Sequence, residues 1–205
     1  MDANAGTEPQ NNKENKLALF CDVVKRRNYW VIGLPAGFLS LTLTGMFFYQ
    51  YLLAQENQWP IQWYAACFAG FGIAKLLFYM FGGVLIDRFT AKKLFPFFLI
   101  PSILGFLILA FVTHRISPLL FLPLIGITVG LSGVITSAAI AEIYGVANIG
   151  RVRSFFTVLT VIAAAAGPVS YGVLLDAGWS FGLIALASCI ILVLISLNNT
   201  QLKQA

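Results

Sequence analysis

Residues 61–94 read IQWYAACFAGFGIAKLLFYMFGGVLIDRFTAKKL. The first 26 positions of this stretch, from Ile61 to Ile86, contain a single charged residue, Lys75. An α-helix needs about 20 predominantly apolar residues to cross the hydrocarbon core of a bilayer, so this run is long enough. The charged residues from Asp87 to Lys93 follow it directly. We therefore predict a membrane-spanning helix that ends at a charged loop.

The composition of the whole chain is that of a membrane protein. Of the 205 residues, 59% are apolar and only 10% are charged, whereas a soluble domain is about 25% charged. A soluble globule of this size could not bury so much apolar surface. The net charge of +5 does not indicate nucleic-acid binding, because the basic residues gather at the ends of apolar runs, as membrane topology requires.

Six apolar runs are long enough to cross a bilayer, and they predict the topology. They lie at residues 29–53, 61–86, 94–112, 118–141, 155–175 and 179–197. An even number of crossings puts both termini on one side. Eleven Lys and Arg residues fall on that side and only Arg115 on the other, so the positive-inside rule predicts a multi-pass cell-membrane protein with both termini in the cytoplasm.

The regions around these runs complete the predicted domain organisation. Residues 1–16 are polar and form a disordered cytoplasmic tail. Residues 17–28 carry apolar side chains at helical spacing and end in cations, which predicts a helix on the inner membrane surface. Residues 29–198 form the six-span transmembrane domain, and residues 199–205 form a second cytoplasmic tail.

A short sequence repeat divides the six spans into two groups. The second run ends in Gly-Val-Leu-Ile-Asp at residues 83–87, and the fifth ends in Gly-Val-Leu-Leu-Asp at residues 172–176. Chance similarity between apolar residues is one explanation. The other is two three-helix units, which must be inverted because each crosses the membrane an odd number of times. The predicted fold is then an all-α membrane protein of six transmembrane helices in two inverted three-helix repeats.

The loop after the second run resembles the signature cytoplasmic loop of the major facilitator superfamily. That loop has a glycine followed four residues later by Asp-Arg, an aromatic residue, Gly-Arg and a basic pair. Ile86, Thr90 and Ala91 depart from this pattern. Departures of this kind resemble the more degenerate copy of the loop that is usually found in the carboxy-terminal half of these transporters. The residues that match are Gly83, Leu85, Asp87, Arg88, Phe89, Lys92, Lys93 and Leu94.

Two downstream segments extend the resemblance to residues 26–197. They are similar to the loop between the tenth and eleventh helices, and to the eleventh helix, of a twelve-helix member. The resemblance implies the carboxy-terminal six-helix half of a carrier similar to oxalate and monocarboxylate carriers, built from inverted repeats around a midplane site. The matching residues are Glu142, Gly150, Arg151, Gly167, Pro168, Gly172, Asp176, Ala177 and Gly178.

The resemblance also implies a charge network at the inner gate. Asp87 would face the start of a fifth-span helix in the opposing half, where the helix dipole and nearby cations favour a carboxylate. The alternative is that these charges only anchor the loops at the membrane surface. Gly167 and Pro168 predict a kink in the fifth span, because proline removes a backbone donor. The network consists of Gly83, Asp87, Arg88, Lys92, Lys93, Glu142, Arg151 and Arg153.

Lys75 is the candidate substrate-binding residue. A charge at that depth costs about 2.5 kcal/mol or more, so it indicates a functional site. No acidic residue lies inside a span to neutralise it, and an unpaired cation suits a small organic anion. Alternatively, Lys75 snorkels to the interface or pairs with a backbone carbonyl. Tyr79, Gln50 and Thr128 are further candidates, although polar side chains in spans also bond to their own helix.

The chain shows no catalytic constellation, metal-ligand spacing or phosphate cradle, so we expect no enzyme activity, cofactor or metal. Because the superfamily works with two six-helix halves, we expect the partners to be the bilayer, a small solute and a second half. Three possibilities stay open. The chain dimerises into a transporter, it is a truncated or split half that acts with a separate half, or it is a membrane interaction protein that does not transport.

Overall fold

The computed structural model describes residues 27–145 and 149–199. Within these ranges the backbone forms helices and short connecting turns, with no strand. The predicted tail at 1–16, nearly all of the predicted surface helix at 17–28 and the end of the chain from residue 200 lie outside the described residues.

Long helices occupy most of the predicted apolar runs. Five of them, α2, α4, α7, α8 and α9, are long and apolar enough to cross a membrane. The described helices, in chain order, are α2 (Arg27–Phe48), α3 (Gln50–Glu56), α4 (Ile61–Arg88), α5 (Ala91–Leu94), α6 (Ile100–Phe111), α7 (Ser117–Tyr144), α8 (Ile149–Asp176) and α9 (Phe181–Asn199).

The third run is not the continuous helix that we predicted. The four-residue α5 comes first, turns follow, and α6 then has only 12 residues. Pro96 lies within these turns and has no backbone N–H to donate to the preceding turn. Pro101 stands at the start of α6, where proline is favoured because the N–H there has no partner within the helix. Phe97 N–H instead donates to Leu94 O at 2.9 Å, three residues back, in a tighter turn. Proline chemistry therefore overrides the apolar pattern at this point.

The first run is also interrupted. α2 ends at Phe48, Tyr49 takes φ −98° and ψ 20°, and α3 continues from Gln50 to Glu56. Leu53 N–H still donates to Tyr49 O at 3.0 Å. α3 is therefore a short extension of the first span rather than a separate crossing.

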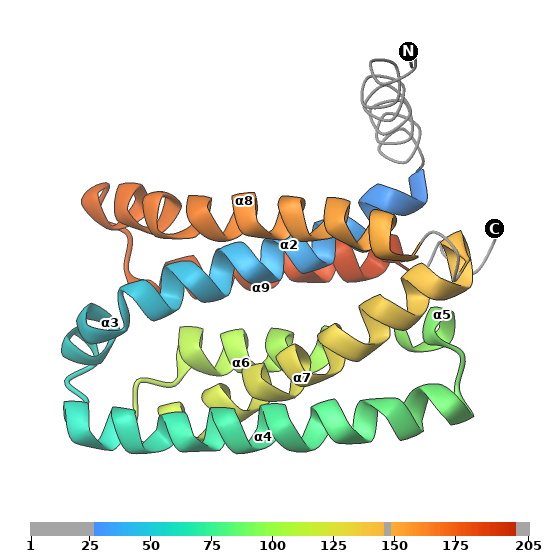
Figure 1. The fold of residues 1–205 in the computed structure, drawn as a ribbon. Coiled ribbons are helices and arrows are strands. Elements are labelled where there is room, and N and C mark those ends of the chain that lie inside the picture. Colours follow the sequence, from blue (N-terminus) through green and yellow to red (C-terminus); the bar gives the residue numbers. More distant parts are fainter. Residues whose placement is uncertain (1–26, 146–148, 200–205) are drawn as a thin grey trace, which may run out of the picture.

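The helix contacts show that the molecule consists of two related units. The most extensive contacts join α4 with α7 and α2 with α8, followed by α6 with α7, α6 with α9 and α2 with α9. Figure 1 shows α2 beside α8 and α9, and α4 beside α6 and α7. Exchanging α2, α4 and α6 with α7, α8 and α9, in that order, maps this set of contacts onto itself. α2 begins at the end of the bundle where α7 ends (Figure 1), so the two units are inverted.

The sequence repeat occupies equivalent places in the two units. Residues 83–87 lie in the last turns of α4, and residues 172–176 form the end of α8. The exchange of units maps α4 onto α8. The GVLID and GVLLD segments therefore end the same helix of each unit, at opposite ends of the bundle.

The ends of the bundle differ in charge. α2 begins and α9 ends at the same end (Figure 1), which we call the basic end because Arg27, Arg88, Lys92, Lys93 and Arg153 lie there. The opposite end has Arg115, in the connection between α6 and α7.

Glycines bring the paired helices into backbone contact. A β-carbon on Gly126 would lie 2.5 Å from Phe71 O, and one on Gly130 would lie 2.5 Å from Lys75 O. In the other pair, a β-carbon on Gly167 of α8 would collide with Leu41 O of α2. Small residues of this kind let helices approach closely where lipid provides no hydrophobic drive. The closest packing therefore occurs between units, α7 on α4 and α8 on α2.

Candidate functional site

Lys75 lies on a side of α4 that opens toward α2 and α7. Its side chain is left exposed by the rest of the chain and lines an open pocket. Gly130 of α7 packs against the Lys75 backbone, which fixes the height of this lysine relative to α7. The other residues that line the pocket are Ser40, Leu43, Thr44, Phe47 and Phe48 of α2, Phe71 of α4 and Val129 of α7.

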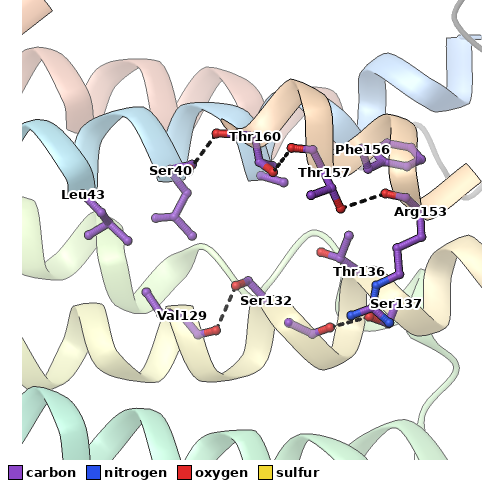
Figure 2. Close-up of a pocket in the computed structure, with 13 residues that line it drawn as sticks. Ser40, Leu43, Val129, Ser132, Thr136, Ser137, Arg153, Phe156, Thr157 and Thr160 are labelled. Carbon is purple, nitrogen blue, oxygen red and sulfur yellow. Dashed lines mark hydrogen bonds between the residues drawn. The ribbon is translucent and has the colours of Figure 1, made fainter. Parts of the chain in front are cut away.

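A second pocket continues from the first between α2, α7 and α8 (Figure 2). Its volume of about 310 Å³ is at the small end of the range for small-molecule sites. Hydroxyl side chains from all three helices project into it, together with the guanidinium of Arg153. The polar lining residues are Ser40, Ser132, Thr136, Ser137, Arg153, Thr157 and Thr160.

A third pocket lies closer to the basic end. Tyr79, Gly83 and Asp87 of α4 form one of its walls, Ser137 of α7 forms another, and Arg153 of α8 reaches in from the third side. Two of the residues predicted for a charge network, Asp87 and Arg153, therefore line one space within a single chain.

The three pockets form one open channel along a face of the bundle, which we call the central groove. The first two share Ser40, Leu43 and Val129, and the last two share Gly133, Ser137 and Arg153. The central groove therefore runs from the Lys75 region to the Asp87 region, and cations stand in both parts.

The serine and threonine hydroxyls of the central groove are mostly engaged with backbone. Ser137 donates to Gly133 O at 2.7 Å, and Ser40 donates across to Thr160 O of α8 at 3.1 Å. Thr44, Ser132, Thr157 and Thr160 donate to carbonyls of their own helices. Of the described serines and threonines that line the groove, only Thr136 makes no hydrogen bond. Its O–H donor is available to a ligand.

The other three residues predicted to contact substrate do not share the Lys75 pocket. Tyr79 lines the basic-end pocket, one helical turn further along α4. Thr128 is fully buried and donates to Leu124 O of its own helix at 3.4 Å. Gln50 begins α3 and lines none of the three pockets of the groove. The structure therefore brings Lys75 together with hydroxyls of α2 that we did not single out as substrate ligands.

The residues predicted for the gate fall into three groups. Gly83, Asp87 and Arg153 line the central groove, but no described side chain forms an ion pair with Asp87 or Arg153. Arg88 lies in a separate, apolar pocket on another side of α4, beside Phe89. Lys92 and Lys93 form the end of α5, and the side chain of Arg151 lies outside the described residues.

Glu142 is hydrogen-bonded to the backbone of a loop rather than paired with a cation. Its carboxylate, near the end of α7, accepts a hydrogen bond at 3.0 Å from Ala91 N–H at the start of α5. The bond joins the loop predicted as the signature motif to the second unit. A carboxylate is favoured at a helix start, where backbone N–H groups lack partners.

Glu56 is an equivalent residue that our sequence analysis missed. At the end of α3, its two carboxylate oxygens accept from Phe181 N–H at the start of α9, at 3.1 and 3.4 Å. The exchange of units maps the α2–α9 contact onto the α7–α6 contact, so Glu56 repeats at the opposite end what Glu142 does at the basic end. The sequence signal was an acidic residue at the end of the first helix of each unit.

Gly167 and Pro168 lie inside α8, which is assigned as one helix from Ile149 to Asp176. Gly167 provides the backbone contact with α2 described above. The kink predicted at this pair stays a prediction.

These features define a class of protein: a multi-pass α-helical membrane protein of two inverted three-helix units, with a polar groove between helices of both units. The family model of the Major Facilitator Superfamily matches residues 30–203. The chain therefore belongs to this superfamily, whose members are transporters. A comparison with curated proteins gave no match.

Proposed function

We propose that this chain is a six-helix half of a transporter that moves a small organic anion by alternating access, with Lys75 as the counter-ion. The observation that carries the proposal is that Lys75, inside a membrane-spanning helix, lines an open groove between the two units. An intramembrane cation is costly unless a ligand, water or a partner repays that cost.

The acidic residues of the described chain support an anion in preference to a cation. Glu56, Asp87, Glu142 and Asp176 all lie at helix ends, so none of them reaches the Lys75 pocket. Phe47 and Phe71 flank Lys75 instead. A carboxylate would give the ammonium group the partner that the protein itself does not provide.

Uptake into vesicles tests the proposal. Purified chain in liposomes, together with its second half where that is a separate chain, should accumulate [14C]oxalate or [14C]formate above empty liposomes, and Lys75→Ala should abolish the difference. Arg115→Gln is the matched control, because it removes one cation at the opposite end and touches no part of the groove. Normal carboxylate transport by Lys75→Ala would refute the proposed role of Lys75.

We also propose that transport requires a second six-helix half. α4 buries only Tyr64, Cys67 and Gly82 along its 28 residues, and the central groove is open on one side. A second half placed over this face would close it. Size measurement in detergent separates the possibilities: a stable dimer supports a homodimeric transporter, whereas a monomer that transports only after a separate half is added supports a split one.

The basic end is proposed to face the cytoplasm, in a plasma or inner membrane. Positively charged loops are retained on the inner side during insertion, and Arg88, Lys92, Lys93 and Arg153 lie at one end. With that orientation, Asp87 and Arg153 stand at the inner mouth of the groove, where the proposed gate would operate.

A further inference from the structure

Arg153 is the second cation of the central groove. It comes from the first turns of α8, and Figure 2 shows its side chain extending from α8 toward Ser137 of α7. Arg153 lines both the hydroxyl pocket and the basic-end pocket. Its guanidinium therefore projects into the space that a solute would cross.

Among the described residues, no partner engages the guanidinium of Arg153. No described side chain forms an ion pair with it, and a guanidinium has five N–H donors. Thr136 lines the same pocket and has a hydroxyl with no hydrogen bond. One charged donor group and one neutral donor therefore face the same pocket, which is the chemistry that a carboxylate needs.

Arg153 and Lys75 line different pockets of the central groove. None of the three pockets is lined by both residues. The residues of α4 that share the basic-end pocket with Arg153 begin at Tyr79, one helical turn beyond Lys75, and continue to Asp87. The two cations therefore offer a carboxylate two places along the groove.

We propose that Arg153 and Thr136 form a second binding site for small carboxylates, nearer the basic end than Lys75. Given the proposed transport function, on which this step rests, the anion occupies this site on its way between the basic end and Lys75. Asp87 lines the same pocket as Arg153. It competes with the anion for the guanidinium, which keeps the site weak enough to release its ligand.

Counting bound anions tests the second site. The full chain in lipid nanodiscs, at low ionic strength, is titrated with [14C]oxalate by equilibrium dialysis, and [14C]formate serves as a monocarboxylate probe. The wild type should bind two anions per chain. Arg153→Gln should bind one, Lys75→Gln should bind one, and the double variant none. Arg115→Gln controls for the loss of one positive charge and should bind two.

Milder variants give graded effects at the Arg153 site alone. Arg153→Lys should keep part of the affinity, because it retains the charge but loses bidentate geometry. Thr136→Val should weaken this site by roughly three- to tenfold, the value of one neutral hydrogen bond. Asp87→Asn should tighten it, because the competing carboxylate is removed. Size-exclusion profiles of all variants check that the chain is folded.

The outcomes separate the two proposals. Two anions bound to Arg153→Gln would refute the Arg153 site and leave the role of Lys75 intact. Two anions bound to Lys75→Gln would refute the role of Lys75. A wild type that binds one anion, lost in Lys75→Gln and kept in Arg153→Gln, supports the proposed function alone. A wild type that binds neither probe contradicts both proposals.

Discussion

The carboxylate of Glu142 in α7 accepts a hydrogen bond from Ala91 N–H at 3.0 Å. α7, the first helix of the second unit, therefore caps α5, which leads into α6. Glu56 and Phe181 N–H form the equivalent bond at the opposite end. Glu142 of the second unit therefore holds α5 of the first unit, and Glu56 of the first unit holds α9 of the second. The two bonds lie at opposite ends of the bundle. A conformational change that opens one end would strain the bond at that end more than the other.

Removing either carboxylate should destabilise the chain. Glu142→Ala and Glu56→Ala should each cost about 1 kcal/mol, the usual value of a helix-capping side chain. Because the two sites are far apart, the double variant should show nearly the sum. Thermal unfolding in detergent measures the effect. A destabilisation confined to Glu142→Ala would show that the two ends are not equivalent.

Gly130→Ala should disturb both packing and transport. The added β-carbon would lie 2.5 Å from Lys75 O, so α4 must move away from α7 and carry Lys75 with it. Overpacking of this kind costs about 1–3 kcal/mol. Gly72→Ala on α4 is the control, since no atom lies within 4 Å of its β-carbon position. Equal thermal stability of the two variants would contradict the close α4–α7 contact.

Asp87→Asn should reduce transport while leaving membrane insertion intact. A carboxylate near a helix start and cations contributes about 0.3–1 kcal/mol, so a gate that depends on it should slow roughly two- to fivefold. Asp176→Asn removes the equivalent carboxylate at the end of α8 and serves as the control. Initial uptake rates in liposomes measure both. Unchanged transport by Asp87→Asn would favour a surface anchor over a gate.

Cysteine labelling tests the orientation. Cys67 and Cys189 are 2% and 5% exposed, so a membrane-impermeant maleimide should not reach them, and Cys21→Ser removes the remaining thiol. In this background Arg115→Cys should label on intact cells. Lys93→Cys should label only after permeabilisation. The reverse pattern would place the basic end outside and overturn the proposed topology.

That the chain consists of apolar helices was predictable from sequence, and five of the six predicted spans are helices long enough to cross a membrane, because crossing a bilayer is a local property. A run such as residues 61–86 needs only length and apolarity, and the lipid provides the same surroundings on every side. The two interruptions were harder. At Pro96 a missing donor breaks the helix within an apolar run, and the pattern of apolar residues contains no trace of that break.

The charge network with an opposing half stays a prediction. Within this chain, Asp87 and Arg153 line one space, which the sequence pattern alone did not indicate. Glu142 bonds to a backbone N–H, a partner that no side-chain pattern can reveal.

The sequence by itself determined that this chain belongs in a bilayer, crosses it with apolar helices, and keeps most of its cations at one end, because hydropathy and charge act residue by residue. Only the tertiary structure decided that Lys75 opens onto a groove, that Arg153 and Thr136 share it, and that Thr128 is buried. The reason is that helices apolar on every side have no preferred face in their sequence. Glycine contacts such as Gly130 on Lys75 select the face, and they form only when the helices meet.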